Sequence, residues 1–443
     1  MTYDYQLAII MKDDRERWNS KIGFILATIG SAVGIGNIWR FSSVVGQNGG
    51  GAYLIPYLIA VFIFAIPLMI LELTIGRYYQ SDVITAFRKV NEKFRFLGLV
   101  ICVVVLLILS YYLVITGWTL GYFISYLTSK DIAFLGFTSS YTPVLYFIVT
   151  ALITGLVVSL GVKKGIEKVS TILIPFSIII LLVLVFFAFT LDGFNDGVSF
   201  LFTPDFSVLS DPLLWGAAFG QAFFSLSVGF GTLITYGSYL DKGVNIPCSS
   251  VIITLSDLLV AILAGLTIFP IVFTFGLQPG MGAELAFSTL PKAFEIMAYG
   301  QILALLFFLL LFFAALTSAI GMLEVGVAAF SDTTGLSRRR TSLILTVILV
   351  FIGLPSALSY TSMNLSIGGV KILDLMDETL GTYGLLFTAF FTSVVFTWFL
   401  DKEFMYDELK DAEGWVRIVY PAVKYIIPFV LVVTLISKIM VKI

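Results

Sequence analysis

Residues 28–41, with the sequence TIGSAVGIGNIWRF, interrupt a hydrophobic segment that is long enough to cross a bilayer. Three glycines, an asparagine and an arginine stand where a regular spanning helix would carry apolar residues. In hydrocarbon every backbone N–H and C=O needs a partner, so irregular backbone is tolerated there only where protein buries it or where it lines a cavity. Broken helices of this kind are typical of secondary transporters, whose half-helix ends and freed carbonyls hold substrate and ions. The stretch therefore predicts a carrier.

The composition is that of a membrane protein. Of the 443 residues, 59% are hydrophobic and 12% are charged, and the mean hydropathy is +1.02. A net charge of −2 and the lack of a basic block argue against a nucleic-acid partner. The chain has no histidine and two cysteines, Cys102 and Cys248, which excludes zinc sites, histidine catalysis and a disulfide framework beyond a pairing of these two. No signal-peptide pattern precedes Met11, which is an alternative start to Met1.

Eleven apolar segments of bilayer length follow one another and predict a single transmembrane domain over residues 1–443. They cover residues 22–45, 52–76, 97–127, 143–160, 169–190, 213–239, 250–275, 299–330, 341–357, 371–400 and 418–441. With a cytoplasmic N-terminus, most of the 26 Lys and Arg residues fall on the cytoplasmic side, whereas the 191–212 loop has four aspartates and no basic residue. We therefore expect a multi-pass protein of the cell membrane with its C-terminus outside.

A second glycine interruption, SLSVGFGTL at 225–233, lies in the sixth segment. An offset of five segments places the two breaks in halves of opposite membrane orientation. This predicts an inverted repeat of five plus five helices, about 18–190 and 213–400, with an extra helix at about 418–441 and the binding site between the two breaks. Such glycines also permit close helix packing, but the polar residues that flank both clusters favour a binding role.

Six stretches resemble the neurotransmitter:sodium symporters, most closely their prokaryotic amino-acid branch, in the same order over nearly the whole chain. They are WNSKIGFILATIGSAVGIGNIWRF, QNGGGAYLIPY, IPLMILELTIGRY, YYLVITGWTLGY, GQAFFSLSVGFGTLITYGSYL and FFAALTSAIGMLE. The resemblance implies an all-α fold of the leucine-transporter type, with segments one and six broken, and sodium-coupled symport of an amino acid by alternating access. The chain departs from the family in having eleven predicted spans, where most members have twelve. This difference bears on the contacts between subunits in an oligomer, for which a homodimer is one possibility.

The resemblance implies two sodium sites made of oxygen ligands. The first would use the carbonyl of Ala32, the amide oxygen of Asn37, the carbonyl and hydroxyl of Ser225, and Asp257 or, one residue away, Ser256. The second would use the carbonyls of Gly30, Val33 and Ala314 and the hydroxyls of Thr317 and Ser318. Such hydroxyls can instead bond back to their own helix, and Asp257 can be a structural acid, although an ionisable group at that depth is usually functional.

Chloride is not an expected partner. Ala261 stands where some relatives place an acid, so Asp257 is expected to supply the negative charge beside the first sodium ion. No resident cofactor is expected.

The substrate prediction starts from charge. Residues 28–39 contain no Asp or Glu, and Gly34 stands where amine-transporting relatives carry an aspartate, so a ligand with its own carboxylate fits best. The resemblance implies that the carboxylate meets the N–H groups of Ile35 and Gly36, the Tyr112 hydroxyl and the first sodium. The other implied substrate-binding residues are Ala32, Phe224, Ser225 and Ser227 on the ammonium side, Ile108, Phe224, Phe230 and Met322 as apolar walls, and Ser318. The walls predict an aliphatic or otherwise apolar amino acid.

The resemblance also implies two gates. Arg40 and Asp377 would close the outer gate above a lid of Tyr112 and Phe224, and Arg15 and Asp332 would form an inner latch with Trp18 wedged beside it. The buried acid Glu72 would support the unwound backbone of segment six.

Other classes of protein fit less well. No nucleophile–base motif or metal cluster is visible, so the chain is not expected to be an enzyme. A channel needs rapid, multi-site exit, to which a closed pocket between broken helices is poorly suited. A sodium-dependent amino-acid sensor on the same fold stays open as an alternative to symport.

Overall fold

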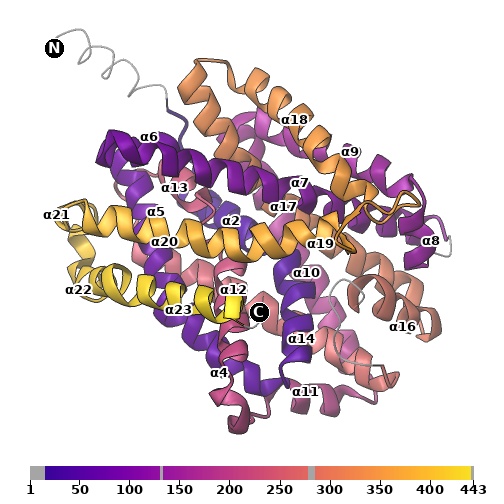
Figure 1. Cartoon of the computed structure of the whole chain (residues 1–443). Coiled ribbons are helices and arrows are strands. Elements are labelled where there is room, and N and C mark those ends of the chain that lie inside the picture. The colour runs from indigo at the N-terminus through magenta and orange to yellow at the C-terminus, as the bar shows by residue number, and fades with distance from the viewer. Residues whose placement is uncertain (1–14, 130–132, 278–284, 441–443) are drawn as a thin grey trace.

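The structure is a computed structural model that describes residues 15–129, 133–277 and 285–440, and these residues are almost entirely helical (Figure 1). Within these ranges nine helices are long and apolar enough to cross a membrane. A tenth span is the pair Lys21–Ala32 and Gly36–Gln47, whose axes bend by 53° at the break between them. The predicted first break is therefore confirmed. The alternative start, Met11, lies outside the described residues.

The first half of the chain contains the following elements, where η denotes a π or 3₁₀ segment: α2 (Lys21–Ala32), η1 (Gly36–Arg40), α3 (Phe41–Gln47), α4 (Gly51–Ile59), η2 (Ala60–Ala65), α5 (Ile66–Tyr79), α6 (Val83–Val90), η3 (Glu92–Phe94), α7 (Arg95–Leu127), α8 (Phe134–Ser139), α9 (Thr142–Ser159), η4 (Val162–Glu167), α10 (Lys168–Ala188), α11 (Phe194–Phe202) and η5 (Phe206–Ser210).

The second half contains α12 (Pro212–Ser225), α13 (Thr232–Gly237), α14 (Ile246–Thr274), η6 (Leu285–Thr289), α16 (Leu290–Ile296), α17 (Gly300–Thr334), α18 (Arg338–Leu358), β1 (Ser366–Ile367), β2 (Val370–Lys371), α19 (Ile372–Met376), η7 (Asp377–Gly384), α20 (Leu385–Trp398), α21 (Glu403–Glu408), η8 (Lys410–Ala412), α22 (Glu413–Pro421), η9 (Ala422–Ile426) and α23 (Ile427–Met440). The strands β1 and β2 pair antiparallel in a small hairpin.

The second break separates α12 from α13. Ser227, Gly229 and Gly231 all have positive φ there, at 54°, 85° and 74°. Glycine adopts this left-handed backbone without steric cost, whereas a residue with a side chain does so only where its surroundings hold it. The glycines of SLSVGFGTL thus end one helix and allow the next to begin, and helix is present at each of the eleven predicted segments.

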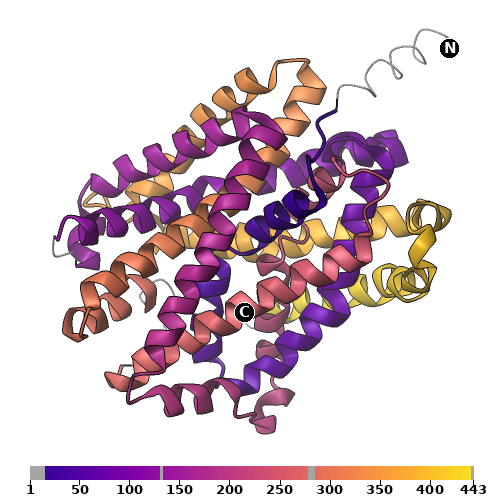
Figure 2. The same ribbon diagram turned by 180° about the vertical axis from the view of Figure 1, so that it is seen from behind.

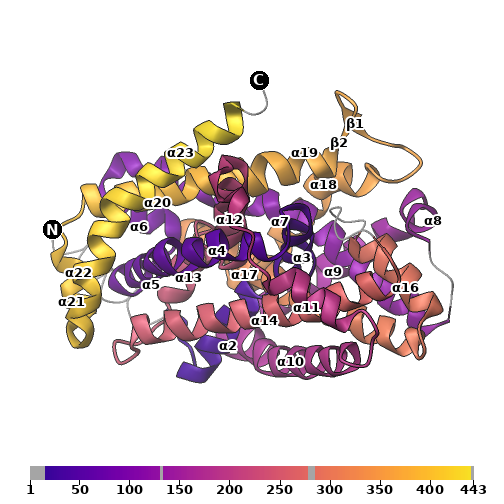
Figure 3. The same cartoon turned by 90° about the horizontal axis from the view of Figure 1, so that it is seen from below.

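The long helices α7 and α17 pack together through the middle of the bundle, and α2 packs against α17, α10 and α14. Figure 3 shows α17 and α13 towards the middle, with α10, α14, α18 and α20 nearer the periphery. The view from behind in Figure 2 shows indigo α2 among its neighbours, while yellow α23 lies on the far side with α20. Both broken helices are thus surrounded by unbroken ones.

The outer helices expose large apolar side chains. On α10 the exposed residues include Ile172, Phe176, Ile179 and Phe186, and α9, α18 and α23 expose similar residues. So many exposed apolar side chains on neighbouring helices would be a liability in water. They suit a surface that faces lipid.

Two glycines bring α5 and α13 into backbone contact. A Cβ atom added at Gly76 would lie 2.1 Å from the carbonyl oxygen of Ile234, and one at Gly237 would lie 2.5 Å from that of Leu73. Backbone atoms cannot swing aside as a flexible side chain can. The second half of the broken sixth span is therefore fixed directly on α5.

We predict that Gly76→Ala lowers thermal stability, because the added methyl group has to push two helices apart. Overpacking of this kind costs about 1–3 kcal/mol. The melting temperature of the purified protein measures this loss of stability. Gly243→Ala is the control, because a Cβ atom at Gly243 meets nothing within 4 Å. Equal melting temperatures for the two variants would show that α5 and α13 separate easily.

Candidate functional site

The two helix breaks line a small buried cavity of about 20 Å³. Its walls are Ser31, Ala32, Gly34, Gly36, Tyr112, Phe224, Ser225, Ser227, Phe230, Ser318 and Met322. None of these described wall residues is charged, and nine of them belong to the set that the sequence predicted for substrate binding. Of the other two predicted residues, Ile35 lines a neighbouring cavity, and Ile108 is fully buried but lines neither. The volume is little more than one water molecule requires.

The neighbouring cavity is larger, about 190 Å³, and shares Gly36, Tyr112 and Phe224 with the small one. Tyr112 and Phe224, the two residues predicted to form the lid, therefore line both cavities. The predicted outer-gate residues Arg40 and Asp377 both line the larger cavity. The Arg40 guanidinium lies 4.4 Å from the centre of the Phe224 ring, and the Tyr111 hydroxyl donates to Asp377 Oδ1 at 3.0 Å. Among the described ion pairs, none joins Arg40 to Asp377.

A first cluster of oxygen atoms joins α12, α14 and the first break. Asn37 Nδ2 donates to Ser225 Oγ (2.9 Å) and to Asp257 Oδ1 (2.6 Å), and Ser225 Oγ donates to Asp257 Oδ2 (2.8 Å). All three side chains are buried. Ser256, the alternative by one residue, is only partly buried and donates to the carbonyl of Ile252 on its own helix. The geometry thus brings three of the residues predicted for the first sodium site together, with Asp257 and not Ser256 facing them.

A second cluster lies where α17 crosses α2. Ser318 Oγ donates to the carbonyls of Gly30 (3.3 Å) and Ser31 (3.0 Å) on α2. Thr317 Oγ1 lies within hydrogen-bond distance of its own helix's carbonyls, including that of Ala314 (3.1 Å). Thr317 thus bonds back to its own helix, which was the alternative to ion binding, whereas Ser318 reaches across to α2.

Two polar side chains hold the backbone freed by the breaks. Glu72, fully buried on α5, accepts a hydrogen bond from the N–H of Gly229 at 2.8 Å. Gln221 on α12 donates through Nε2 to the carbonyl of Gly36 at 2.8 Å. The sequence pointed to Glu72 but not to Gln221. A polar residue inside the apolar sixth segment was the available signal.

The family model described as the Sodium:neurotransmitter symporter family matches residues 15–142 and 131–443 of the chain. The chain belongs to this family. It is therefore a sodium-dependent transporter and a multi-pass membrane protein, not an enzyme.

Individual relatives agree with this family assignment. The chain is 38% identical to MhsT, whose crystal structure in complex with L-phenylalanine superposes with a TM-score of 0.89 and covers 96% of this chain and 99% of that one. An uncharacterized sodium-dependent transporter of Methanocaldococcus jannaschii is 35% identical over 411 residues, 87% of this chain and 82% of the relative. YhdH of Bacillus subtilis, also an uncharacterized sodium-dependent transporter, is 36% identical over 380 residues, 82% and 83% of the two chains. The structural match confirms the leucine-transporter type of fold.

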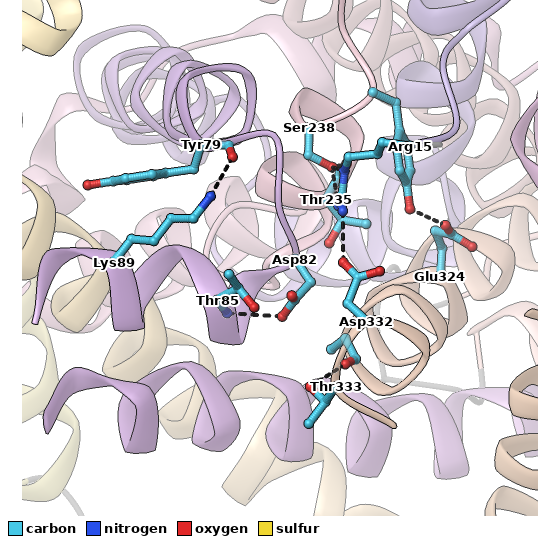
Figure 4. Close-up of polar contacts among 12 residues, drawn as sticks. Arg15, Tyr79, Asp82, Thr85, Lys89, Thr235, Ser238, Glu324, Asp332 and Thr333 are labelled. Carbon is cyan, nitrogen blue, oxygen red and sulfur yellow. Dashed lines mark hydrogen bonds and ion pairs between the residues drawn. The ribbon is translucent and has the colours of Figure 1, made fainter. Parts of the chain in front are cut away.

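At one end of the bundle, residues that precede α2 contact α17 and the end of α13 (Figure 4). We call it the latch end. Arg15 Nη1 donates to Asp332 Oδ2 at 2.7 Å and Nη2 donates to Ser238 Oγ at 2.8 Å. Trp18 is buried and donates through Nε1 to the carbonyl of Tyr236 at 3.0 Å. The latch residues predicted from the sequence thus meet, and Ser238 adds a contact that the sequence did not indicate.

Neighbouring charges at the latch end shift the pKa values of Arg15 and Asp82. Burial lowers the pKa of Arg15, but the neighbouring Tyr239 and Asp332 raise it, and the net direction is upward. Asp82 lies nearby and caps α6 by accepting from the N–H of Thr85 at 3.1 Å. Burial raises the pKa of Asp82, and the negative charge of Asp332 adds to this effect while Arg15 opposes it. Arg15 is therefore the cation that two acids share.

Proposed function

We propose that this symporter carries an apolar amino acid into the cell together with sodium, by alternating access. The observation that supports this most is the small cavity between the breaks, which is lined by main-chain groups, hydroxyls and apolar side chains, with no charged side chain among its described walls. An uncharged pocket of this kind fits a ligand that carries both charges itself. The two adjoining oxygen clusters then supply places for the coupling ions.

The α-carboxylate is proposed to bind at the start of the second half of the first span. The N–H of Ile35 already points at the Tyr112 hydroxyl, 3.3 Å away, and Gly36 follows at the positive end of the half-helix. A carboxylate placed there would accept from both N–H groups and from Tyr112. The ammonium group would face the carbonyls of Ala32, Phe224 and Ser225 and the Ser227 hydroxyl.

The side chain of the ligand would lie among Phe224, Phe230 and Met322. The rings of Phe224 and Phe230 meet edge to face, with their centres 5.8 Å apart. Because the cavity is only about 20 Å³, the walls have to move apart for any amino acid to enter. The L-phenylalanine complex of MhsT supports including aromatic amino acids within the apolar class.

Sodium is proposed to occupy both oxygen clusters. At the first, Asn37, Ser225 and Asp257 would turn oxygen atoms towards the ion in place of the bonds that they now make to one another, and the carbonyl of Ala32 would add a further ligand. At the second, Gly30, Val33, Ala314, Thr317 and Ser318 would do the same. Each positive charge that crosses is driven by about 2.3 kcal/mol per 100 mV, which sustains accumulation of a zwitterion.

The latch end is proposed to face the cytoplasm and the 190 Å³ cavity to face outside, in line with the distribution of Lys and Arg. The structure then represents a state closed to the inside. Residues 18–190 and 213–400 are proposed as the two inverted repeats, with the eleventh helix packed outside them on α20 and α12.

Uptake into liposomes tests the proposal. Liposomes that contain the purified protein and are filled with potassium buffer should accumulate radiolabelled L-phenylalanine or L-leucine only when the outside buffer contains sodium. The uptake should saturate as the amino-acid concentration rises. Equal uptake from potassium or choline would rule out sodium coupling. Sodium-dependent binding without uptake would indicate a sensor, and a steady current without saturation would indicate a channel.

Tyr112→Phe should weaken amino-acid binding, because it removes only the hydroxyl assigned to the carboxylate. A hydrogen bond to a charged group is worth about 1.5–3 kcal/mol. Calorimetric titration in sodium measures the change in Kd, and the melting temperature checks that the fold is intact. Tyr299→Phe serves as the control because that side chain is 75% exposed. An unchanged Kd would show that Tyr112 only packs.

Asp257→Asn should make transport depend on chloride or abolish it. In the wild type the Asp257 carboxylate is the only acidic group in the first cluster, so it neutralises the proposed sodium ion without an anion. Uptake by the wild type and by the Asp257→Asn variant is measured in chloride and in gluconate. Asp196→Asn is the control, because Asp196 is exposed. Slower wild-type uptake in gluconate, or normal chloride-free uptake by the variant, would contradict this role.

A further inference from the structure

A short segment before α2, residues 15–20, is tied to several helices at the latch end. Arg15 and Trp18 bind α13, the residue that follows it and α17, as described above. The other side of the segment faces the connection between α9 and α10, which includes η4. Two glutamates on this side take no part in the latch already described.

Glu167, in η4, binds the start of α2. Its Oε2 accepts from the N–H of Asn19 at 2.7 Å, and its Oε1 accepts from the Ser20 hydroxyl at 2.9 Å. Ser20 in turn accepts from the N–H of Gly23 at 2.9 Å, as the N-terminal cap of α2. A Cβ at Gly23 would lie 1.9 Å from Glu167 Oε1, so glycine at this position leaves the space that the carboxylate fills.

Glu16, just before α2, binds the start of η4. Its carboxylate accepts from the N–H of Val162, the first residue of η4. Gly161 before it has φ of +92°, and a Cβ there would lie 2.7 Å from Glu16 Oε1. The helix that begins at Val162 continues through α10 to Ala188. Arg338 also lies near Glu16, with Nε 3.6 Å from Oε1.

The two contacts are reciprocal. Glu16, just before α2, accepts from the N–H of Val162 at the start of η4, and Glu167, at the end of η4, accepts from the N–H of Asn19 and the hydroxyl of Ser20 just before α2. The helix dipole favours a negative charge near both helix starts. Glu167 is only 5% exposed, and none of the described ion pairs includes it. The N–H of Asn19 and the hydroxyl of Ser20 are therefore the described groups that compensate this buried charge.

We propose that Glu16 and Glu167 form a reciprocal clasp that makes α2 and the start of α10 leave their closed positions together. The proposal rests on the proposed alternating access and adds positioning residues to it. Both helices border the second oxygen cluster, since a Cβ at Gly30 would contact Ile174 of α10 and Thr317 of α17 at 3.1 Å each. Release of the clasp would open that cluster to water from the latch end, and the Arg15–Asp332 pair would be a separate fastening on the other side.

Hydrogen–deuterium exchange of the full-length protein, in sodium and without substrate, tests the clasp. Glu16→Gln and Glu167→Gln should each raise exchange several-fold, both in residues 24–32 of α2 and in residues 168–177 of α10. Exchange in the double variant should be only slightly higher than in either single variant, because each single change already releases both helices. Glu92→Gln, at an exposed glutamate, should leave exchange unchanged.

Two independent caps give a different pattern. Each variant would then affect mainly the helix whose N–H groups it leaves free, and the effects would add in the double variant; that result overturns the proposal. If Glu167→Gln does not fold, Ser20→Ala removes one of its two contacts and should raise exchange in both helices to a smaller extent. Exchange needs neither substrate nor gradient, so this outcome is separate from the success or failure of the uptake experiment.

Discussion

The need to satisfy backbone groups at two helix breaks inside an apolar bundle governs the rest of this structure. Asn37 Oδ1 accepts from the N–H of Gly34 at 3.1 Å, and Ser227 donates to the carbonyl of Ser31 at 2.9 Å. Together with Glu72 and Gln221, these side chains account for much of the freed backbone. The main-chain groups that remain along the cavity walls are then available to a ligand, which is how irregular backbone at membrane depth becomes a binding site.

The two ends of the bundle are closed to different extents. The latch end combines the Arg15–Asp332 pair, buried Trp18 and the hydrogen bonds of Glu16 and Glu167, whereas Arg40 and Asp377 line the larger cavity and form none of the described ion pairs with each other. A partly exposed ion pair is worth only about 0–1 kcal/mol. The latch end is therefore held by several contacts and not by this ion pair alone, which would suit a gate that opens in every cycle.

Phe224 connects these ends to the site. It lines both the small cavity and the large one, and its ring contacts that of Phe230 and lies 4.4 Å from the Arg40 guanidinium. A shift of this ring would enlarge the small cavity and change the position of Arg40 at the same time. In the proposed mechanism, ligand entry and outer closure would therefore both depend on this side chain near the end of α12.

The sequence by itself determined the elements and the breaks, because hydropathy, segment length and glycine act within a few residues of the chain. The family resemblance added Tyr112, Ser318 and Asp257. Only the tertiary structure decided which neighbours meet. Asp257 faces the cluster and Ser256 does not, since adjacent residues on a helix point about 100° apart. The hydrogen bonds of Gln221 to Gly36 and of Glu167 to Asn19 join segments that are far apart in the sequence. Such contacts depend on how each helix is rotated and packed, which the residue pattern within one segment does not determine.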